Sequence, residues 1–288
     1  MARSSPTWRS RTWPPSAGCA RHPRPPWTED GDLNHELVLG NPKIQRLRRL
    51  LGRRSARAEE GVVAVEGETL IREALAAGWT LEAQFVASGA HPIPAAEPVH
   101  VLAPGVLERV VTTETPQPHV AIFECPASRR ERLETASFVV VAVDIADPGN
   151  LGTMLRSAEA AGADLMVVSP TTVDVFNPKV IRSSAGSVFR LPVVEVENLE
   201  QVRRAGRSIV ASSSHRGTDY DHVDFRRSVA IVLGNEASGL DESVPVDEWV
   251  SIPRVGRAES LNVAMACTVL CFEIARQRRA ASGTVDPR

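Results

Sequence analysis

The chain has 288 residues, of which 43% are hydrophobic and 24% are charged, and its formal net charge is −2. This length and composition allow a sizeable core and two domains, while the near-neutral charge means that a polyanion needs a local basic patch. No run of about 18 apolar residues is present, which argues against a membrane-spanning helix and for a protein that does not act in a membrane.

Residues 1–40 are rich in proline, serine and arginine and contain Trp8, Trp13 and Trp27. Prolines interrupt every periodic pattern, including the apolar segment that a signal peptide needs. We predict a disordered leader over residues 1–40, with an RNA-contacting arm as the alternative.

The first predicted helix begins at Asn41-Pro42, because asparagine is a good N-cap and proline favours the first helical position. Cations without any acid fill the polar positions of residues 41–57, and such a run is either a solvated face or a footprint for RNA phosphates. The RNA-binding candidates among them are Lys43, Arg46, Arg48, Arg49 and Arg53.

Short apolar runs and helical patterns alternate up to residue 125. The predicted strands are 62–65, 81–87, 99–102 and 120–123, and the predicted helices are 69–77 and 104–110. This alternation predicts a small α/β domain over residues 41–125. The polar residues 126–136 are interpreted as a linker.

A second α/β domain is predicted over residues 137–280. Residues 138–145 form a continuous apolar run, as expected for a parallel strand buried on both faces. Further predicted strands are 165–168, 191–194, 208–212, 229–233 and 249–252, separated by helices that include one ending at Gly162, 180–184, 200–205 and a last one after Ser260. The pattern is typical of a doubly wound parallel sheet, without the glycine motif of dinucleotide binding. Residues 281–288 are predicted to be a disordered tail.

Four cysteines, Cys19, Cys125, Cys267 and Cys271, form no Cys-x-x-Cys pair and have no histidine at metal-ligand spacing. Cys267 and Cys271 lie one helical turn apart on an apolar face, which favours core thiols over a redox or metal role. We therefore expect a reduced, cytoplasmic protein without a metal site.

Polar residues follow two of the predicted strands. Asn235 and Glu236 come directly after 229–233, while Ser260 and Asn262 follow 249–252 at the head of the last helix. Ser260 is the predicted N-cap of that helix. Ligands bind at the carboxyl edge of open α/β sheets, so these loops are either a site or two ordinary turns.

Three blocks carry a resemblance to a known family: Asn150-Leu-Gly-Thr-Met-Leu-Arg156, Leu233-Gly-Asn-Glu236 with the later Ile252-Pro253, and Ser260-Leu-Asn-Val263. In this order and spacing the chain resembles the SpoU (TrmH) family of RNA ribose 2′-O-methyltransferases, of the SPOUT superfamily, over residues 41–278. Residues 65–68 and 113–117 also resemble the ribosomal-protein-L30e-like substrate-binding domain that precedes many members.

The resemblance implies a fold and a cofactor. The second domain would be a SPOUT domain whose C-terminal segment threads a deep trefoil knot, an exception to the rule that chains avoid knots. The knotted loops would hold S-adenosylmethionine. Matched by position, the cofactor-binding residues are Ser212, Leu233, Gly234, Asn235, Ile252 and Leu261. The catalytic residues are Asn150, Arg156, Glu236, Ser260 and Asn262.

The roles of these residues follow from the chemistry of a ribose 2′-OH, which is a poor nucleophile. Guanidinium groups are poor bases, so we interpret Arg156 as a fork that holds a phosphate and stabilises the developing alkoxide. Glu236 is expected to orient Arg156 or the loop, and Asn150 is either a site residue or a helix cap. The resemblance also implies a homodimer, in which Arg156 of one chain reaches the cofactor pocket of the other.

The sequence thus predicts transfer of a methyl group from S-adenosylmethionine to a ribose 2′-OH of RNA. Ribosomal RNA, and 23S rRNA in particular, is favoured because tRNA-specific relatives usually lack the L30e-like domain. The alternatives are a tRNA ribose 2′-O-methyltransferase and a catalytically inactive RNA-binding homologue.

Overall fold

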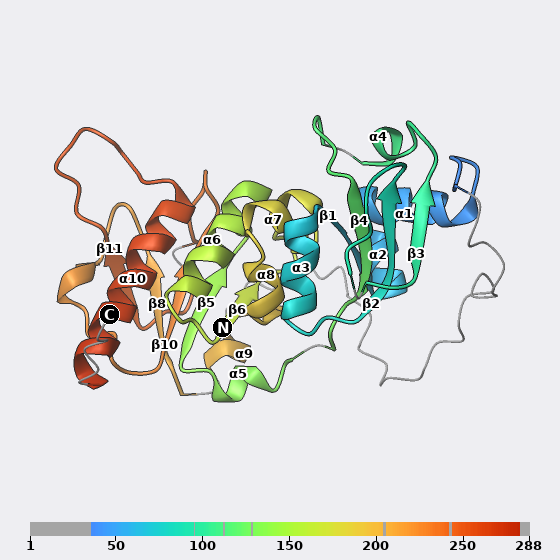
Figure 1. The fold of residues 1–288 in the computed structure, drawn as a ribbon. Helices are drawn as coiled ribbons and strands as arrows, with labels where there is room; N and C mark the ends of the chain where they lie inside the picture. The colour runs from blue at the N-terminus through green and yellow to red at the C-terminus, as the bar shows by residue number, and fades with distance from the viewer. Residues whose placement is uncertain are drawn as a thin grey trace, which may run out of the picture. The chain divides into compact units, whose positions relative to one another are not determined.

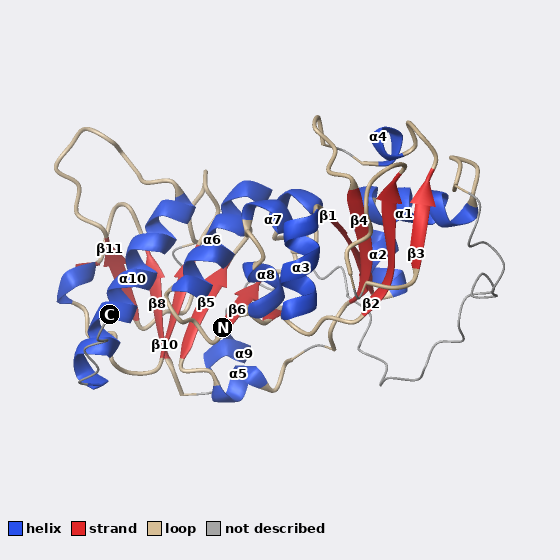
Figure 2. Cartoon of the chain, in the orientation of Figure 1, coloured by secondary structure: helices blue, strands red, loops and turns tan. Residues whose placement is uncertain are grey.

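A computed structural model describes residues 36–282, except residues 95, 112, 128, 204–205 and 242–243. The described chain forms two compact units (Figure 1). One comprises residues up to Ala127 together with Phe176–Ile181, and the other comprises the remaining residues from 129 onwards. Helices and strands alternate in both units (Figure 2), as the sequence predicts.

Residues 36–40 belong to the fold, which corrects the prediction that order begins at Asn41. Leu37 is buried and forms a parallel bridge with Leu102. Its N–H donates to the carbonyl of Val101 at 2.7 Å, and its carbonyl accepts from the N–H of Ala103 at 3.0 Å. The ordered chain therefore begins before Asn41, because Leu37 is buried and pairs with the segment around Leu102. The rest of the predicted leader lies outside the described residues.

The first unit contains a four-stranded sheet in the order β1-β4-β2-β3. Its β1–β4 and β4–β2 pairs are antiparallel, and its β2–β3 pair is parallel. The strands are β1 (Val62–Glu66), β2 (Leu81–Ala87), β3 (Val99–Leu102) and β4 (His119–Glu124). The helices are α1 (Pro42–Gly52), α2 (Arg54–Glu60), α3 (Glu68–Ala76) and α4 (Leu107–Val110).

Helix α1 forms for the reasons that the sequence gives. The Asn41 side chain accepts a hydrogen bond from the N–H of Lys43 at 2.9 Å, so asparagine is the N-cap, and Pro42 takes the first helical position. The apolar face buries Ile44, Leu47 and Leu50 in the core of this unit. Helix α2, in which Ala56 and Arg57 are buried, was not predicted.

The second unit contains a seven-stranded sheet in the order β7-β6-β5-β10-β8-β11-β9, and every neighbouring pair is parallel. The strands are β5 (Phe138–Ala142), β6 (Leu165–Val168), β7 (Val193–Glu195), β8 (Ser208–Ser212), β9 (Thr218–Asp219), β10 (Val229–Leu233) and β11 (Glu248–Ser251). The helices after residue 129 are α5 (Arg132–Thr135), α6 (Pro148–Ala160), α7 (Pro178–Ser183), α8 (Ser187–Arg190), α9 (Glu200–Arg203), the 3-10 helix η1 (Tyr220–His222) and α10 (Val263–Ser282). Of these, α7 belongs to the first unit up to Ile181.

Strands β5 and β10 form the centre of this sheet and are buried along their whole length. Burial on both faces explains their uninterrupted apolar sequences. Figure 1 shows α6 and α10 side by side on one face of the sheet, where Ser157 and Thr268 share a hydrogen bond of 2.7 Å. On the other face, β-strand residues such as Val139 and Val232 pack in a common core with Val202 of α9.

The predicted linker and tail are partly helical. Helix α5 lies within residues 126–136, and Ala136 is buried in the core of the second unit. Helix α10 extends through Ser282, so only residues 283–288 of the predicted tail lie outside the described residues. No helix within the described residues is long and apolar enough to cross a membrane.

Candidate functional site

The carboxyl ends of four neighbouring strands gather the candidate residues at one edge of the parallel sheet. In the order β5-β10-β8-β11, the loops after Ala142, Leu233, Ser212 and Ser251 leave this edge side by side. Ser212 therefore lies between Leu233 and the segment that begins at Ile252. This is the position at which open α/β sheets bind ligands.

Three of the predicted catalytic side chains contact one another. The side-chain amide of Asn150 donates to Glu236 Oε1 at 2.9 Å, and Asn150 Oδ1 accepts from the amide of Asn262 at 3.0 Å. Residues from the start of α6, the loop after β10 and the start of α10 thus meet in one polar cluster. We call Asn150, Glu236 and Asn262 the polar triad.

Glu236 is the anionic member of the polar triad. Its carboxylate also accepts from the backbone N–H groups of Ala146 at 3.4 Å and Asp147 at 3.3 Å. Burial acts to raise the pKa of Glu236, but the hydrogen bonds from Asn150 and from backbone N–H groups outweigh it, and the pKa is lowered. A carboxylate that accepts from three donors, in the loop after β5 and at the start of α6, is suited to orienting the loop rather than to accepting a proton.

Two helix caps explain why the triad side chains face the site. Asp147 caps α6 by accepting from the N–H of Asn150 at 2.9 Å, which leaves the Asn150 side chain available to Glu236. Asn262 Oδ1 accepts from the N–H groups of Ala264 at 2.9 Å and Met265 at 3.3 Å. The N-cap of α10 is therefore Asn262, and the prediction of Ser260 is wrong because α10 begins two residues later.

A second set of contacts, which the sequence analysis missed, holds the loop after β5. Asp144 lies two residues after the end of that strand with φ at +56°, a left-handed conformation, and its carboxylate accepts from the hydroxyls of Ser169 and Thr171. The carbonyl of Asp144 in turn accepts from the Asn235 amide at 2.8 Å. Asn235 therefore uses its side chain within the protein, and only its backbone remains for the predicted role in cofactor binding.

Arg156 and Ser260 are not brought to the polar triad. Both are exposed, and neither side chain has a hydrogen bond or ion pair with another described residue. Arg156 lies six residues after Asn150 on α6, which places it about 120° around the helix and about 9 Å farther along. It therefore points away from the triad of its own chain.

The residues predicted to bind the cofactor fit an adenosine group. Leu233 and Gly234 are buried, Ile252 is partly exposed, and Leu261 is 40% exposed next to Asn262. Apolar side chains that remain accessible beside polar loop groups can cover an adenine ring and leave its edge to the backbone. These residues therefore suit S-adenosylmethionine. Among the described residues, the one metal-like grouping is the exposed Asp219, Asp221 and His222.

Glycine is required at position 234 because the loop after β10 folds back and brings Gly239 close to the backbone of Gly234. A Cβ atom at this position would lie 2.4 Å from the carbonyl oxygen of Gly239 and 2.5 Å from its carbonyl carbon, so the backbone would have to move. We expect Gly234→Ala to destabilise the fold by about 1–3 kcal/mol and to weaken S-adenosylmethionine binding at least tenfold, as measured by calorimetry. Gly256→Ala is the matched control, because its Cβ would meet no atom within 4 Å. Equal effects of the two substitutions would contradict this prediction.

The predicted RNA-binding residues in and next to α1 differ in exposure and in whether they form ion pairs within the protein. Arg46 is ion-paired with Glu60 and Glu82 and its side chain is largely buried, while Arg49 is paired with Glu60. Arg48 and Arg53 are exposed without a side-chain partner among the described residues, and Lys43 is partly exposed. RNA contact by this helix stays a prediction, chiefly for Arg48 and Arg53.

Comparison with known proteins agrees with this geometry. Residues 137–272 match the model of the SpoU rRNA methylase family, and residues 41–121 match an MRM3-like substrate binding domain. The chain is 32% identical to the Bacillus subtilis 23S rRNA (guanosine(2553)-2′-O)-methyltransferase RlmP over 244 residues, which cover 81% of this chain and 96% of that protein. The chain belongs to the SpoU rRNA methylase family.

Other SpoU relatives extend over both units. A 23S rRNA (uridine(2479)-2′-O)-methyltransferase of Streptomyces viridochromogenes is 34% identical over 265 residues, covering 84% of this chain and 92% of the relative. The crystal structure of the SpoU methyltransferase AviRb from the same organism, in complex with AdoMet, matches with a TM-score of 0.74 and 32% identity. It covers 83% of this chain and 98% of that one. The predicted family, fold class and substrate-binding domain are thereby confirmed.

Proposed function

We propose that this protein transfers a methyl group from S-adenosylmethionine to a ribose 2′-OH of 23S rRNA. The polar triad at the carboxyl edge of the sheet carries the proposal, because it joins the three family blocks at the place where the apolar cofactor residues lie. The relatives named for 23S rRNA methylation span both units of this chain. The trefoil knot and the cytoplasmic location implied by the family belong to the same proposal.

In this reaction the protein's own groups position the reacting ribose, hold a neighbouring phosphate and stabilise negative charge. Bound S-adenosylmethionine supplies an electrophilic methyl group on its sulfonium. Asn150, Glu236 and Asn262 fix the starts of α6 and α10 against the loop after β10, which would position a ribose 2′-OH bound at this edge of the sheet. Arg156 holds the neighbouring phosphate and stabilises the negative charge that develops on the 2′-oxygen, and the hydroxyl proton passes to solvent water.

Mapping of ribose methylation in total RNA, from cells with and without the protein, tests this function. We expect one or more 2′-O-methyl groups in 23S rRNA to disappear without the protein and to return when it is supplied. Loss confined to tRNA would support the tRNA alternative. An unchanged map with wild-type protein present would support the inactive RNA-binding homologue.

We further propose a homodimer formed through the exposed face of α10. Leu261, Met265 and Phe272 are 40%, 53% and 44% exposed and follow one face at the start and along the length of this helix. Helix α10 packs against α6, which carries the exposed Arg156. A second copy that packs on this face would cover the apolar side chains. Arg156 of each protomer would then lie near the polar triad of its partner.

The double variant Met265→Glu/Phe272→Glu is expected to be monomeric, because four buried charges in a two-fold interface would lack partners. Sedimentation velocity should show half the wild-type mass at micromolar concentration, with methyl transfer lost. Val38→Glu is the control, since Val38 is 59% exposed but lies outside α10. A double variant that still sediments as a dimer would rule out this interface.

A further inference from the structure

Asp144 has a left-handed backbone, which is rare for residues other than glycine. It follows the last residue of β5 by two positions, and its φ is +56°. Most side chains other than those of asparagine and aspartate disfavour this conformation, and a residue keeps it where the surrounding structure holds it in place. Within the described residues, Ala185 is the one other non-glycine residue with a positive φ. None of the tasks proposed above for methyl transfer belongs to Asp144.

Hydroxyl groups in the loop after β6 hold both the side chain and the backbone of Asp144. Ser169 Oγ donates to Asp144 Oδ1 at 2.9 Å and accepts from the Asp144 N–H at 2.9 Å. The hydroxyl of Thr171 donates to the same carboxylate oxygen. Ser169 is 2% exposed, and a hydroxyl group buried to this degree needs its hydrogen-bond partners. The carboxylate therefore ties the left-handed turn to the loop after β6.

The left-handed turn directs the Asp144 carbonyl toward the loop after β10. That carbonyl accepts from the side-chain amide of Asn235 at 2.8 Å. Asn235 Oδ1 in turn accepts from the N–H groups of Ala237 at 2.9 Å and Ser238 at 3.1 Å. The Asn235 side chain thus links the shape of the loop after β10 to the orientation of one carbonyl group.

The residues that follow Asp144 contact the same loop through their backbone. The N–H groups of Ala146 and Asp147 donate to Glu236 at 3.4 and 3.3 Å. Ile145, between them and Asp144, is fully buried. Asp144 and the three residues after it therefore form a short segment that contacts the loop after β6 on one side and the loop after β10 on the other. A change of backbone conformation at Asp144 would move both sets of contacts.

We propose that Asp144 is a positioning residue for S-adenosylmethionine, because it holds the loop after β10 in the shape that binds the cofactor. The inference rests on the proposed function, in which Leu233, Gly234 and the Asn235 backbone bind the cofactor. Asp144 acts through Asn235 and the loop rather than on the reacting atoms. Its loss should therefore lower the affinity for S-adenosylmethionine more than it lowers kcat at saturating cofactor.

Two substitutions of Asp144 and one of its hydroxyl partner test the proposal by calorimetry. Asp144→Ala removes the acceptor of two hydroxyl groups and disfavours the left-handed turn, so we expect the Kd of S-adenosylmethionine to rise about tenfold. Asp144→Asn keeps an acceptor oxygen and the tolerance for a left-handed backbone, so its Kd should stay close to that of the wild type. Ser169→Ala removes the opposing hydroxyl and should raise the Kd roughly threefold.

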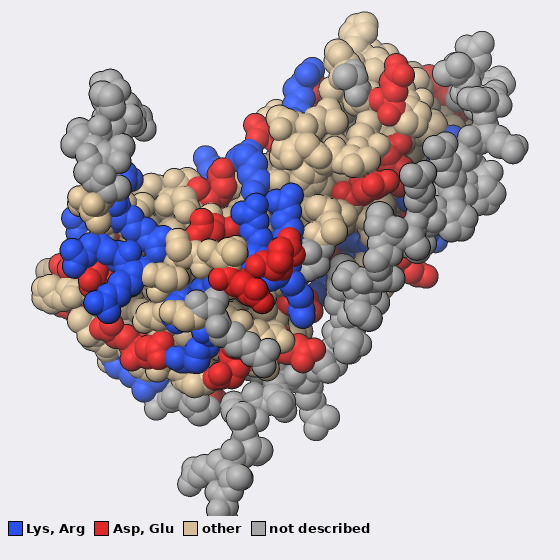
Figure 3. Space-filling view, turned by 90° about the horizontal axis from the view of Figure 1, so that it is seen from below, with Lys and Arg blue, Asp and Glu red and all other residues tan. Residues whose placement is uncertain are grey.

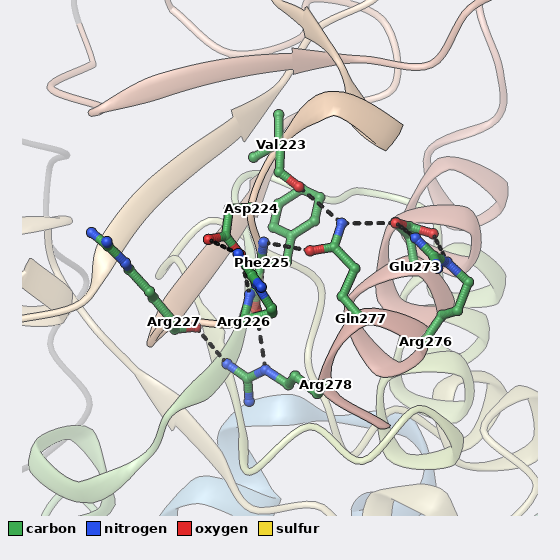
Figure 4. Close-up of polar contacts among 9 residues, drawn as sticks. All are labelled: Val223, Asp224, Phe225, Arg226, Arg227, Glu273, Arg276, Gln277 and Arg278. Atoms are coloured by element: carbon green, nitrogen blue, oxygen red, sulfur yellow. Dashed lines mark hydrogen bonds and ion pairs between the residues drawn. The ribbon is translucent and has the colours of Figure 1, made fainter. Parts of the chain in front are cut away.

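The opposite edge of the same sheet provides a matched control. Asp164 precedes β6 by one residue, and its carboxylate accepts from the N–H groups of Ser137 and Phe138 at 2.8 Å each. Figure 4 shows further contacts at this edge, where Gln277 of α10 accepts from the N–H of Phe225 at 2.8 Å. Figure 3 shows acidic and basic side chains interspersed over the face seen from below, so one carboxylate fewer on such a surface leaves a mixed pattern of charge. Asp164→Ala should lower the melting temperature and leave the Kd of S-adenosylmethionine unchanged, because a strand of about 15 Å separates it from the loop after β10.

A double-mutant cycle tests whether Asp144 acts through Asn235. Asn235→Ala alone should also weaken cofactor binding, since the loop loses the hydrogen bonds of that side chain. The loss of binding free energy in Asp144→Ala/Asn235→Ala should then be well below the sum of the two single losses. Losses that add fully would overturn the proposed route.

The remaining outcomes separate this inference from the proposed function. A folded Asp144→Ala variant with wild-type affinity for S-adenosylmethionine would overturn the role of Asp144, and so would wild-type affinity in Ser169→Ala. An equal rise of the Kd in Asp164→Ala would assign the effect to general stability and would also overturn it. Absence of S-adenosylmethionine binding by the wild type would reject the proposed function first.

Discussion

Replacement of Arg156 with alanine is expected to lower kcat for methyl transfer by a factor of about 100 to 1,000. The side chain is exposed on α6 and has no hydrogen bond or ion pair with another described residue, so its removal should disturb the fold little. The loss should appear in the chemical step, because the guanidinium is assigned to the alkoxide and its neighbouring phosphate. S-adenosylmethionine affinity and melting temperature should stay within error of the wild type.

Single-turnover methyl transfer from labelled S-adenosylmethionine measures this effect without interference from product release. Arg132→Ala is a suitable control, since Arg132 is an exposed arginine of α5 in the same unit. Arg156→Lys separates charge from geometry: a two-pronged phosphate contact predicts that lysine restores only a small part of the rate. Wild-type kcat in Arg156→Ala would remove this residue from the mechanism.

Most strands of the parallel sheet could be predicted from short apolar runs, whereas β9 (Thr218–Asp219) contains no apolar residue and was not predicted. Strand β10 has the predicted bounds, and β5 begins where predicted. The same run continues to Ile145, but the structure ends the strand at Ala142 because Asp144 takes a left-handed conformation. Hydroxyls from the loop after β6 hold that conformation, and no local pattern records a contact 25 residues away.

The N-caps of α6 and α10 could be predicted only in part from the local sequence. Asp147-Pro148 carries a cap signal that the sequence analysis did not use, although aspartate followed by proline is a standard helix start. At α10 both Ser260 and Asn262 are good caps, and only the position of the first helical turn selects between them. The family blocks contain Asn150, Glu236 and Asn262, and the fold links these three side chains by hydrogen bonds, while their roles in the reaction stay predictions.

The partners of the basic residues in helix α1 could not be predicted from the local sequence. Residues 41–57 contain no acid, so the sequence left every cation available for RNA. In the fold, Glu60 and Glu82 approach Arg46 from α2 and β2. Ion pairs of this kind depend on tertiary structure, and a charge count within one segment cannot reveal them.

The position of Arg156 leads to an expectation about the assembled enzyme. Asn262 contacts Asn150 within one chain, whereas Arg156 faces away from that pair. If each site combines a triad from one protomer with Arg156 from its partner, Arg156→Ala and Asn262→Ala remove different protomers' contributions. A heterodimer of the two variants then contains one site with both residues intact.

Co-expression of Arg156→Ala and Asn262→Ala should therefore restore activity that neither variant has alone. Random pairing makes half of the dimers mixed, and one of two sites in each is intact, so roughly a quarter of the wild-type activity is the ceiling. Differently tagged chains allow the mixed dimer to be purified, where the ceiling rises to about half. Two Arg156→Ala chains with different tags provide the control for tagging and mixing. Purified mixed dimers without methyl transfer would show that each chain completes its own site, because a site confined to one chain gains nothing from its partner.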